Sequence, residues 1–313
     1  MARKLVLLGI AVVLAASASA RELTSAYVIT AVANKAGLAG TDWHTDLTIY
    51  NPQSRALQVT LIYLPGGQDN SAGGFSPGPI QVHPWETLNL WDVLGPHGFA
   101  ARGQTGAMLV YTDHAANGCP GTAGDESCDF ALFARNYTLA PYGGTGEFGQ
   151  DFPGFPAGLG VDWTVIAYMP QIMDDSNFRT NVGVASWTNA YVTVREDIQD
   201  ASGNVIGSHD HVIPPYGQTQ WRLEDSGITG GTVAAYVVGG PADALVYPYA
   251  TVVNWTTGDA TTVEAQITKV GLAAATATRA EAAATMARSA ARHLPPLLRA
   301  PVFSLDELRQ RRR

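Results

Sequence analysis

The feature that most constrains the fold of this chain is an internal repeat. The stretch TDWHTDLTIYNPQSRALQVTLIYLP at 41–65 returns in a looser form, SNFRTNVGVASWTNAYVTVREDIQD, at 176–200. Trp43 and Thr45 have Phe178 and Thr180 as their counterparts. A stretch that keeps its pattern better than its letters indicates one structural unit used twice.

The correspondence continues downstream of the opening stretch. Pro84 and Trp85 match Pro215 and Tyr216 in a shared proline–aromatic pair. Each copy spans about 110–120 residues with about seven predicted strands, the size of an immunoglobulin-like sandwich. The further matching segments are VHPWETLNL (82–90) with IPPYGQTQW (213–221), GAMLVYTD (106–113) with GTVAAYVV (231–238), and 130–150 with 244–266.

Alternating polarity within each copy predicts β-strands. In WHTDLTIYNP, the side chains of Trp43, Thr45, Leu47 and Ile49 fall on one face, and Asn51-Pro52 ends the strand because proline offers no ladder donor. We therefore predict an all-β protein of two tandem immunoglobulin-like β-sandwich domains. A single barrel made by both copies is the alternative.

The predicted domain boundaries follow from composition. The first sandwich covers 21–148, a Gly/Pro-rich linker covers 149–162, and the second sandwich covers 163–270. Phe152 and Phe155 within the linker are expected to pack against a domain. The linker should therefore hold the two domains in a preferred orientation.

The strand and turn DLTIYNPQSRALQVTLIYLP resembles the opening of secreted bacterial immunoglobulin-like modules of the CARDB and hydin-related kind. The resemblance covers about 25 residues in each copy. It implies a β-sandwich fold and an extracellular setting, and it brings no catalytic residues with it.

The two ends of the chain differ from the body. Residues 1–20 combine Arg3 and Lys4 with an apolar run and an Ala18-Ser19-Ala20 site, which predicts a cleaved secretory signal peptide; an uncleaved anchor is the alternative. The chain is then expected to be secreted, periplasmic or at the cell surface, with no membrane span after cleavage. Residues 271–313 predict a disordered or partly helical basic Ala/Arg-rich tail; the alternative is a tail that docks on the acidic body or binds an anionic partner.

Charge excludes one class of partner. Between 21 and 270 the chain holds nine basic and 24 acidic residues, because the ends carry the other ten basic and three acidic ones. Nucleic-acid binding needs a clustered basic face, and the few basic residues of the body are scattered along the sequence. We expect no nucleic-acid partner.

Two insertions distinguish the first copy, PGGQDNSAGGFSPG at 65–78 and the loop between Cys119 and Cys128. Insertions in a repeat map to loops, so we predict that these two form the working surface. Export to an oxidising compartment also predicts a disulfide between Cys119 and Cys128, and no second ligand pair is present for a thiolate metal site.

Few residues point to metal binding or catalysis. His209 and His211 share one strand face, as in zinc or copper sites, with a solvated edge as the alternative. Asp42 and Asp46 in one copy, and Asp174 and Asp175 in the other, are candidate oxygen ligands for Ca²⁺ beside the same strand, or plain turn residues. No other cofactor is expected.

No motif of a hydrolase nucleophile occurs in the chain. Asp113-His114 lies next to the disulfide loop, where it is a candidate binding pair, but nothing in its spacing demands a catalytic triad. We do not predict an enzyme.

Aromatic residues carry the remaining functional signal. Trp85 and Trp91 lie at a strand end where exposure is expected, so they are candidate binding residues. We therefore expect a non-catalytic protein for adhesion, scaffolding or assembly at the cell surface, with an extracellular protein or a polysaccharide as partner. A carbohydrate-binding protein that uses exposed Trp and Tyr is the second hypothesis, and a hydrolase with an unrecognised site is the third.

Overall fold

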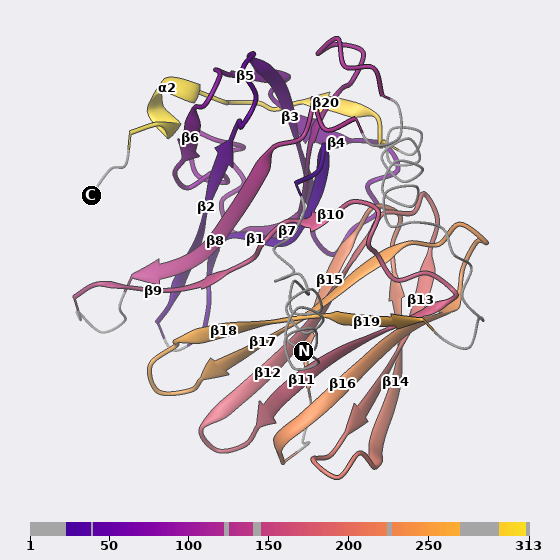
Figure 1. Cartoon of the computed structure of the whole chain (residues 1–313). Helices are drawn as coiled ribbons and strands as arrows, with labels where there is room; N and C mark the ends of the chain where they lie inside the picture. Colours follow the sequence, from indigo (N-terminus) through magenta and orange to yellow (C-terminus); the bar gives the residue numbers. More distant parts are fainter. Residues whose placement is uncertain are drawn as a thin grey trace, which may run out of the picture.

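The computed structural model describes residues 23–38, 40–121, 125–139, 145–223, 227–269 and 294–310, so the predicted signal peptide lies outside it. Strands dominate this part of the chain, which confirms the all-β prediction (Figure 1). A first half runs to β10 and a second half from β11 to β19. The strands of the first half are β1 (Ala26–Ala36), β2 (Asp42–Tyr50), β3 (Leu57–Pro65), β4 (Gly74–Ser76), β5 (Pro79–Val82), β6 (Thr87–Leu90), β7 (Gln104–Thr112), β8 (Ala131–Leu139), β9 (Glu147–Asp151) and β10 (Phe155–Pro156).

The second half consists of two facing sheets around one apolar core. One sheet has the order β14-β13-β16-β11-β19 and the other β15-β12-β17-β18. Val182, Val194 and Val233 are fully buried between them, on the inward positions of their strands. The strands are β11 (Val165–Asp174), β12 (Phe178–Ser186), β13 (Val192–Gln199), β14 (Val205–Ile213), β15 (Gln218–Arg222), β16 (Ile228–Gly239), β17 (Val246–Asn254), β18 (Ala260–Glu264) and β19 (Gln266–Lys269).

The first half repeats this strand order. Strands β4 and β5 pair with β3, which continues to β7, β1 and β10, and β6-β2-β8-β9 forms the other face of the core. The first half differs because β1 also pairs with β2 at its end, through Lys35 and Ala36, so its sheets are joined into one path. Strand by strand, β1–β3 match β11–β13 and β6–β10 match β15–β19. The repeat seen in the sequence predicts the matches of β2, β3, β6, β7 and β8, whereas β1 and β10 lie outside the matched segments.

A strained turn recurs at the same place in both halves. The N–H of Glu86 donates to the carbonyl of His83, and that of Gly217 donates to the carbonyl of Pro214. Both turns carry a proline at the second position and a non-glycine residue with positive φ at the third, Trp85 at 60° and Tyr216 at 46°. This is the type II geometry, which normally selects glycine or asparagine at that position.

The two halves pack together through an apolar interface. The outward side chains of β1, β3 and β7, among them Val28, Ile62 and Leu109, are buried against Tyr216 and Tyr247 of the second half. Strand β1 is therefore buried on both faces, and its sequence AYVITAVAN lacks the polar alternation of a surface strand.

The insertion at 65–78 belongs to this interface. The N–H of Gly67 donates to the carbonyl of Gln218, and the N–H of Asn70 donates to that of Pro215. The buried Asn70 side chain donates to the carbonyls of Pro65 and Tyr216, at 3.0 and 2.9 Å. The backbone of this insertion therefore fastens one half to the other, a structural role that the prediction of a working surface did not include.

Most of the predicted linker at 149–162 is built into the first half, whereas Val161 pairs with Val246 and lies in the core of the second half. Residues of β9 pair with β8, and Phe155-Pro156 pair with Tyr27-Val28 of β1. Phe152 is buried and meets the ring of Tyr249 edge-on at 5.5 Å, and Phe155 packs beside Tyr247. The expectation that both phenylalanines pack against a domain is confirmed: Phe155 does so from β10, and Phe152 from the residue that follows β9.

Part of the predicted tail is docked on the first half, as Figure 1 shows in yellow. Strand β20 (Leu297–Arg299) pairs in parallel with β4, and the short helix α2 (Leu305–Leu308) places Leu308 in the core. Phe303 meets Phe99 edge-on at 5.3 Å. Over 294–310 the expectation of a disordered or partly helical tail is therefore replaced by its alternative, a tail docked on the body. Apolar side chains hold this segment, while 270–293 lie outside the described residues.

The second insertion of the first half contains the disulfide. Cys119 and Cys128 form the predicted bond. Arg55 donates to the carbonyls of Asn117 and Ser127 beside it, so this insertion folds back on the β2–β3 turn.

Polar side chains cover the outer surface of the β14-β13-β16-β11-β19 sheet. The Arg195 guanidinium donates two hydrogen bonds to Asp210, and Tyr236 donates to Asp197.

Candidate binding face

The outward surface of the β6-β2-β8-β9 sheet is the candidate functional site. Alternation along β2 and β8 turns one set of side chains to the core and the other set away from it. Within the part of the chain that the structure describes, no other element covers the middle of this surface, and Phe133 is 46% exposed there. The surface is called the open face below, and its side chains on β2 and β8 are His44, Thr48, Tyr50, Phe133, Arg135 and Tyr137.

Aromatic and guanidinium groups follow β8 across the open face. The Cζ of Arg135 lies 5.2 Å from the Tyr137 ring centroid, and Arg135 donates to Glu147 at 3.0 Å. Tyr137 is stacked with His44 on the neighbouring strand at 5.6 Å. Tyr50 is 36% exposed, one diagonal step from Phe133. Tyr, Phe and Arg are the residue types that protein interfaces favour at their centres.

A polar cluster ends this surface. His44 Nδ1 lies 3.1 Å from Asp92, and its Nε2 lies 3.6 Å from Asp42. Asn34 donates to the same Asp92 carboxylate at 2.9 Å. The hydrogen bond to Asp92 raises the pKa of His44, with a smaller contribution from Asp42 that burial of the ring opposes. A cationic imidazole between two carboxylates is thus favoured at this end of the face.

The same face is covered in the second half. Register places Tyr249 opposite Gly183 as Phe133 lies opposite Thr48, so the two rings occupy equivalent positions of the repeat. Phe133 is 46% exposed, whereas Tyr249 is fully buried against the first half. One copy of this surface is an interface already, and the other is open.

The structure separates the two tryptophans predicted as binding residues. Trp85 is 61% exposed at the strained turn, whereas Trp91 is only partly exposed and its backbone N–H donates to the carbonyl of Leu308. Trp163 is the other tryptophan with a large exposed fraction, 45%, and it lies in the second half. No row of exposed indoles is present among the described residues.

His209 and His211 lie together on the inward side of β14, and His211 has Trp221 and Glu196 as partners, which were not expected. The ring of His211 stacks on Trp221 at 3.6 Å, and its Nε2 lies 3.6 Å from Glu196, which is 1% exposed. Trp221 donates its indole N–H to Glu196. Burial raises the pKa of Glu196 to about 7 and lowers that of His211, so near neutral pH this contact is not a strong ion pair.

A signal for Glu196 was present in the sequence. In VTVREDIQ, the inward positions are Val192, Val194, Glu196 and Ile198, so a carboxylate stands in an apolar series. The cluster lies where the edge strands β14 and β15 meet at the rim of the core. Titratable groups with shifted pKa values gather at functional sites and in buried structural networks alike.

The aspartates predicted as calcium ligands have separate hydrogen-bonding roles. Asp46 accepts from the N–H of Asp92, and Asp174 accepts from that of Thr180. Asp175 accepts from the N–H groups of Asn177 and Phe178 within its turn. Asp42 is exposed beside His44. Within the described ranges, no three His, Cys, Asp or Glu side chains come together in a group able to hold a metal ion.

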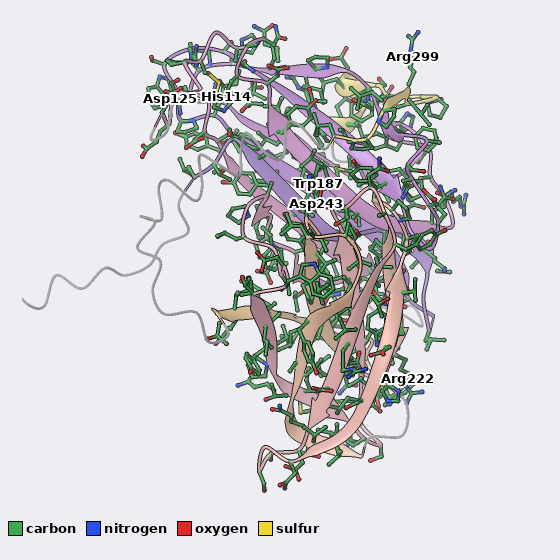
Figure 2. All side chains as sticks on the ribbon, turned by 90° about the vertical axis from the view of Figure 1, so that its right-hand side faces the viewer. His114, Asp125, Trp187, Arg222, Asp243 and Arg299 are labelled. Atoms are coloured by element: carbon green, nitrogen blue, oxygen red, sulfur yellow. A yellow bond between two sulfur atoms is a disulfide. The ribbon has the colours of Figure 1, made fainter. Side chains whose placement is uncertain are left out.

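Asp113 and His114 are also separated in role. Asp113 accepts from the N–H groups of Ala115 and Ala116 and so shapes the turn before the disulfide loop. Neither ring nitrogen of His114 has a hydrogen-bond partner among the residues that the structure describes. Figure 2 shows His114 and Asp125 close together beside the yellow disulfide, at the end of the molecule away from the second half.

Comparisons with known proteins assign no family. No protein-family model and no curated protein matches this chain. Within the described part of the chain, none of the helices has the length and apolar character needed to cross a membrane.

Proposed function

We propose that this chain is a secreted or cell-surface, non-catalytic adhesion or scaffolding protein that binds a protein partner through the open face. One observation carries the proposal: the equivalent surface of the second half is buried against a neighbouring sandwich, while the copy in the first half remains exposed. A surface with an aromatic and arginine centre and a charged margin has the composition of a protein interface.

The fold supports the proposal through the rigidity of the support. A binding surface is most precise when it lies on strands that are fixed by packing on their other side. The inward residues of β2 and β8, Leu47, Ile49 and Ala134, are fully or almost fully buried in the core. The disulfide agrees with an oxidising compartment, which is the setting that the proposal requires.

We further propose that each half is an immunoglobulin-like sandwich with its outer strands exchanged. The pairs β12–β15 and β13–β16 correspond to the B–E and C–F pairs of the immunoglobulin order. The first strand, β11, pairs with β16, and the seventh, β17, pairs with β12, whereas an immunoglobulin constant domain pairs A with B and G with F. The shared central four strands support the relationship.

The test measures binding of the purified protein to envelope material from the producing cells. We expect saturable binding that protease treatment of the envelope removes. Changing Tyr50, Phe133 and Tyr137 together to Ser should weaken it at least about tenfold, because aromatic anchors dominate such interfaces. The matched control changes Ile206 and Val212, which are 50% and 59% exposed on β14 of the other half, to Ser.

The outcome also decides a second candidate, a polysaccharide ligand, which the 61% exposed ring of Trp85 favours. Binding that survives protease and is lost after periodate oxidation of the envelope supports the polysaccharide and contradicts a protein partner. Equal binding by the triple variant and the native chain rejects the open face for both.

A further inference from the structure

Two arginines of the second half lie over one indole ring. Arg179 is the second residue of β12, Arg222 ends β15, and Trp255 follows β17. Their Cζ atoms lie 5.1 and 4.8 Å from the centroid of Trp255. Only nine basic residues occur between 21 and 270, so two of them on one ring form a concentrated positive site in an acidic chain. Figure 2 places Arg222 away from the contact between the halves, which Trp187 and Asp243 mark.

Strand register explains this arrangement. Arg222 pairs with Asn181, and Arg179 pairs with Val253, which puts both arginines on the outward surface of the β15-β12-β17-β18 sheet. Further along the strands, Tyr249 lies on the same surface and is buried against the first half. The arginines lie beyond the covered part, at the end of the sheet where β15 stops.

The charged groups that the structure describes at this site are mostly basic. Asp174 is the one carboxylate paired with either arginine in the described residues, at 3.4 Å from Arg222, and its other oxygen accepts from the N–H of Thr180. Among the described residues, the site therefore holds two guanidinium groups and one carboxylate. Burial lowers the pKa of Arg179, and the charge of Arg222 lowers it further, against the opposing effect of Asp174.

Arg179 is held in an unusual state. It is 7% exposed, and its Nε has no hydrogen-bond partner among the described residues. Buried guanidinium groups normally use their donors in hydrogen bonds to carboxylates, and the Nε of Arg179 departs from this rule. Arg222 differs, because its side chain is 47% exposed and its donors can reach solvent.

We propose that Arg222, Arg179 and Trp255 form a binding site for the carboxylate group of a small organic acid. Arg222 supplies accessible guanidinium N–H donors, and the buried Arg179 supplies a second positive charge. The indole of Trp255 keeps the two guanidinium groups adjacent. The site is independent of the open face, since it lies on the other half.

The geometry of the donors selects the class of anion. The guanidinium fork matches the two coplanar oxygens of a carboxylate. Phosphate carries a higher charge, and the field of a chain with a net charge of −8 opposes that second negative charge.

The experiment titrates the full chain with D-glucuronate, D-glucose and inorganic phosphate while following the indole N–H resonance of Trp255, which a Trp255→Phe variant identifies. We expect a saturable shift with glucuronate, no shift with glucose and weaker binding of phosphate. Arg222→Gln should weaken glucuronate binding at least about tenfold, because it removes the accessible fork. Arg195→Gln is the matched control, since Arg195 is a half-exposed arginine on the opposite sheet and pairs with Asp210.

The test substitutes Arg222 and leaves Arg179 unchanged. Arg222 is exposed, so its substitution should not unfold the protein, whereas substitution of the buried Arg179 could do so. The absence of a saturable shift with glucuronate, an equal shift with glucose, or unchanged affinity in Arg222→Gln overturns the site. Tighter binding of phosphate than of glucuronate overturns its assignment to carboxylates.

Discussion

Two equivalent sheet surfaces, one in each half, differ in that one is covered by the other half and one is exposed. In the second half, Tyr247 and Tyr249 turn that surface into an interface with the first half, and both are almost wholly buried. In the first half the equivalent positions hold Ala131 and Phe133, and Phe133 remains 46% exposed. A repeated unit therefore carries one docking surface per copy, and stacking two copies occupies only one of them.

The interiors of the two halves differ as well. Register aligns Leu61 and Leu90 of the first core with Glu196 and Trp221 of the second. Both leucines are fully buried, whereas the second core holds at these positions a buried carboxylate and a partly buried indole that are hydrogen-bonded to each other. The same framework thus tolerates an apolar or a polar pair at its rim, provided that the polar pair is satisfied.

The largest expected effect comes from a substitution in the covered contact between the halves, compared with one on the open face. Ile62→Asp introduces a carboxylate into the contact between the halves, where Ile62 is fully buried, and should lower the free energy of unfolding by about 4 kcal/mol or more. Phe133→Asp on the open face should change it by less than about 1 kcal/mol. Chemical denaturation measures both, and equal losses contradict the distinction.

The second prediction concerns the polar core pair. The folded-state pKa of Glu196 is raised from 4.5 to about 7, so its contribution to stability is fully present below about pH 4.5 and is lost as the pH rises to about 7. The unfolding free energy of Glu196→Gln and of the native chain is measured at pH 4.5 and pH 8. The variant should be more stable relative to the native chain at pH 8 than at pH 4.5, by about 3 kcal/mol. Leu61→Met, a matched substitution in the first core, should leave the pH dependence unchanged; a parallel pH profile for Glu196→Gln and the native chain contradicts the assignment.

A third prediction tests the segment that only the first half possesses. Leu308→Ala removes a 2% exposed side chain from the first core and should lower the free energy of unfolding by about 2 kcal/mol. Leu298→Ala, at a position 40% exposed on β20, should cost less than about 0.5 kcal/mol. Thermal and denaturant unfolding of the two variants compare them, and a neutral Leu308→Ala contradicts docking of the tail.

The smallest expected effect sharpens the comparison at the repeated turn. Trp85→Asn relieves a positive φ at an exposed position and should stabilise the protein by about 0.5–1 kcal/mol, because asparagine tolerates this conformation. Tyr216→Asn at the equivalent turn should destabilise it by about 3 kcal/mol, because Tyr216 is buried against Trp187. Opposite signs in denaturant midpoints are the expected result, and a shared sign contradicts it.

The sequence predicted the repeating part of the fold well. Alternating side chains identified the strands, and the matched pairs Trp43–Phe178 and Trp85–Tyr216 occupy equivalent places in the structure. These features are local, because period-two polarity and turn residues act within a few residues of one another. The disulfide between Cys119 and Cys128 was predictable for the same reason.

The contacts between distant segments were not predictable in this way. The insertion at 65–78 reads as a surface loop by composition, yet Asn70 bonds to Tyr216 across the interface. The stack of Arg179 and Arg222 on Trp255 joins three strand ends that are far apart in the sequence. Only the phase of Glu196 within VTVREDIQ offered a local sign of what the structure places around it.

The outer surface of the β14-β13-β16-β11-β19 sheet has a consequence for how far such a stack extends. Ile62 and Leu109, which receive the second half, are replaced there by Asp197 and Ala234, and the paired Arg195 and Asp210 lie beside them. A third sandwich added in the same manner would strip water from these charges. The second half therefore acts as a cap in the sense of linear repeat arrays, whose terminal units carry a polar outer side that ends growth and keeps the array from polymerising.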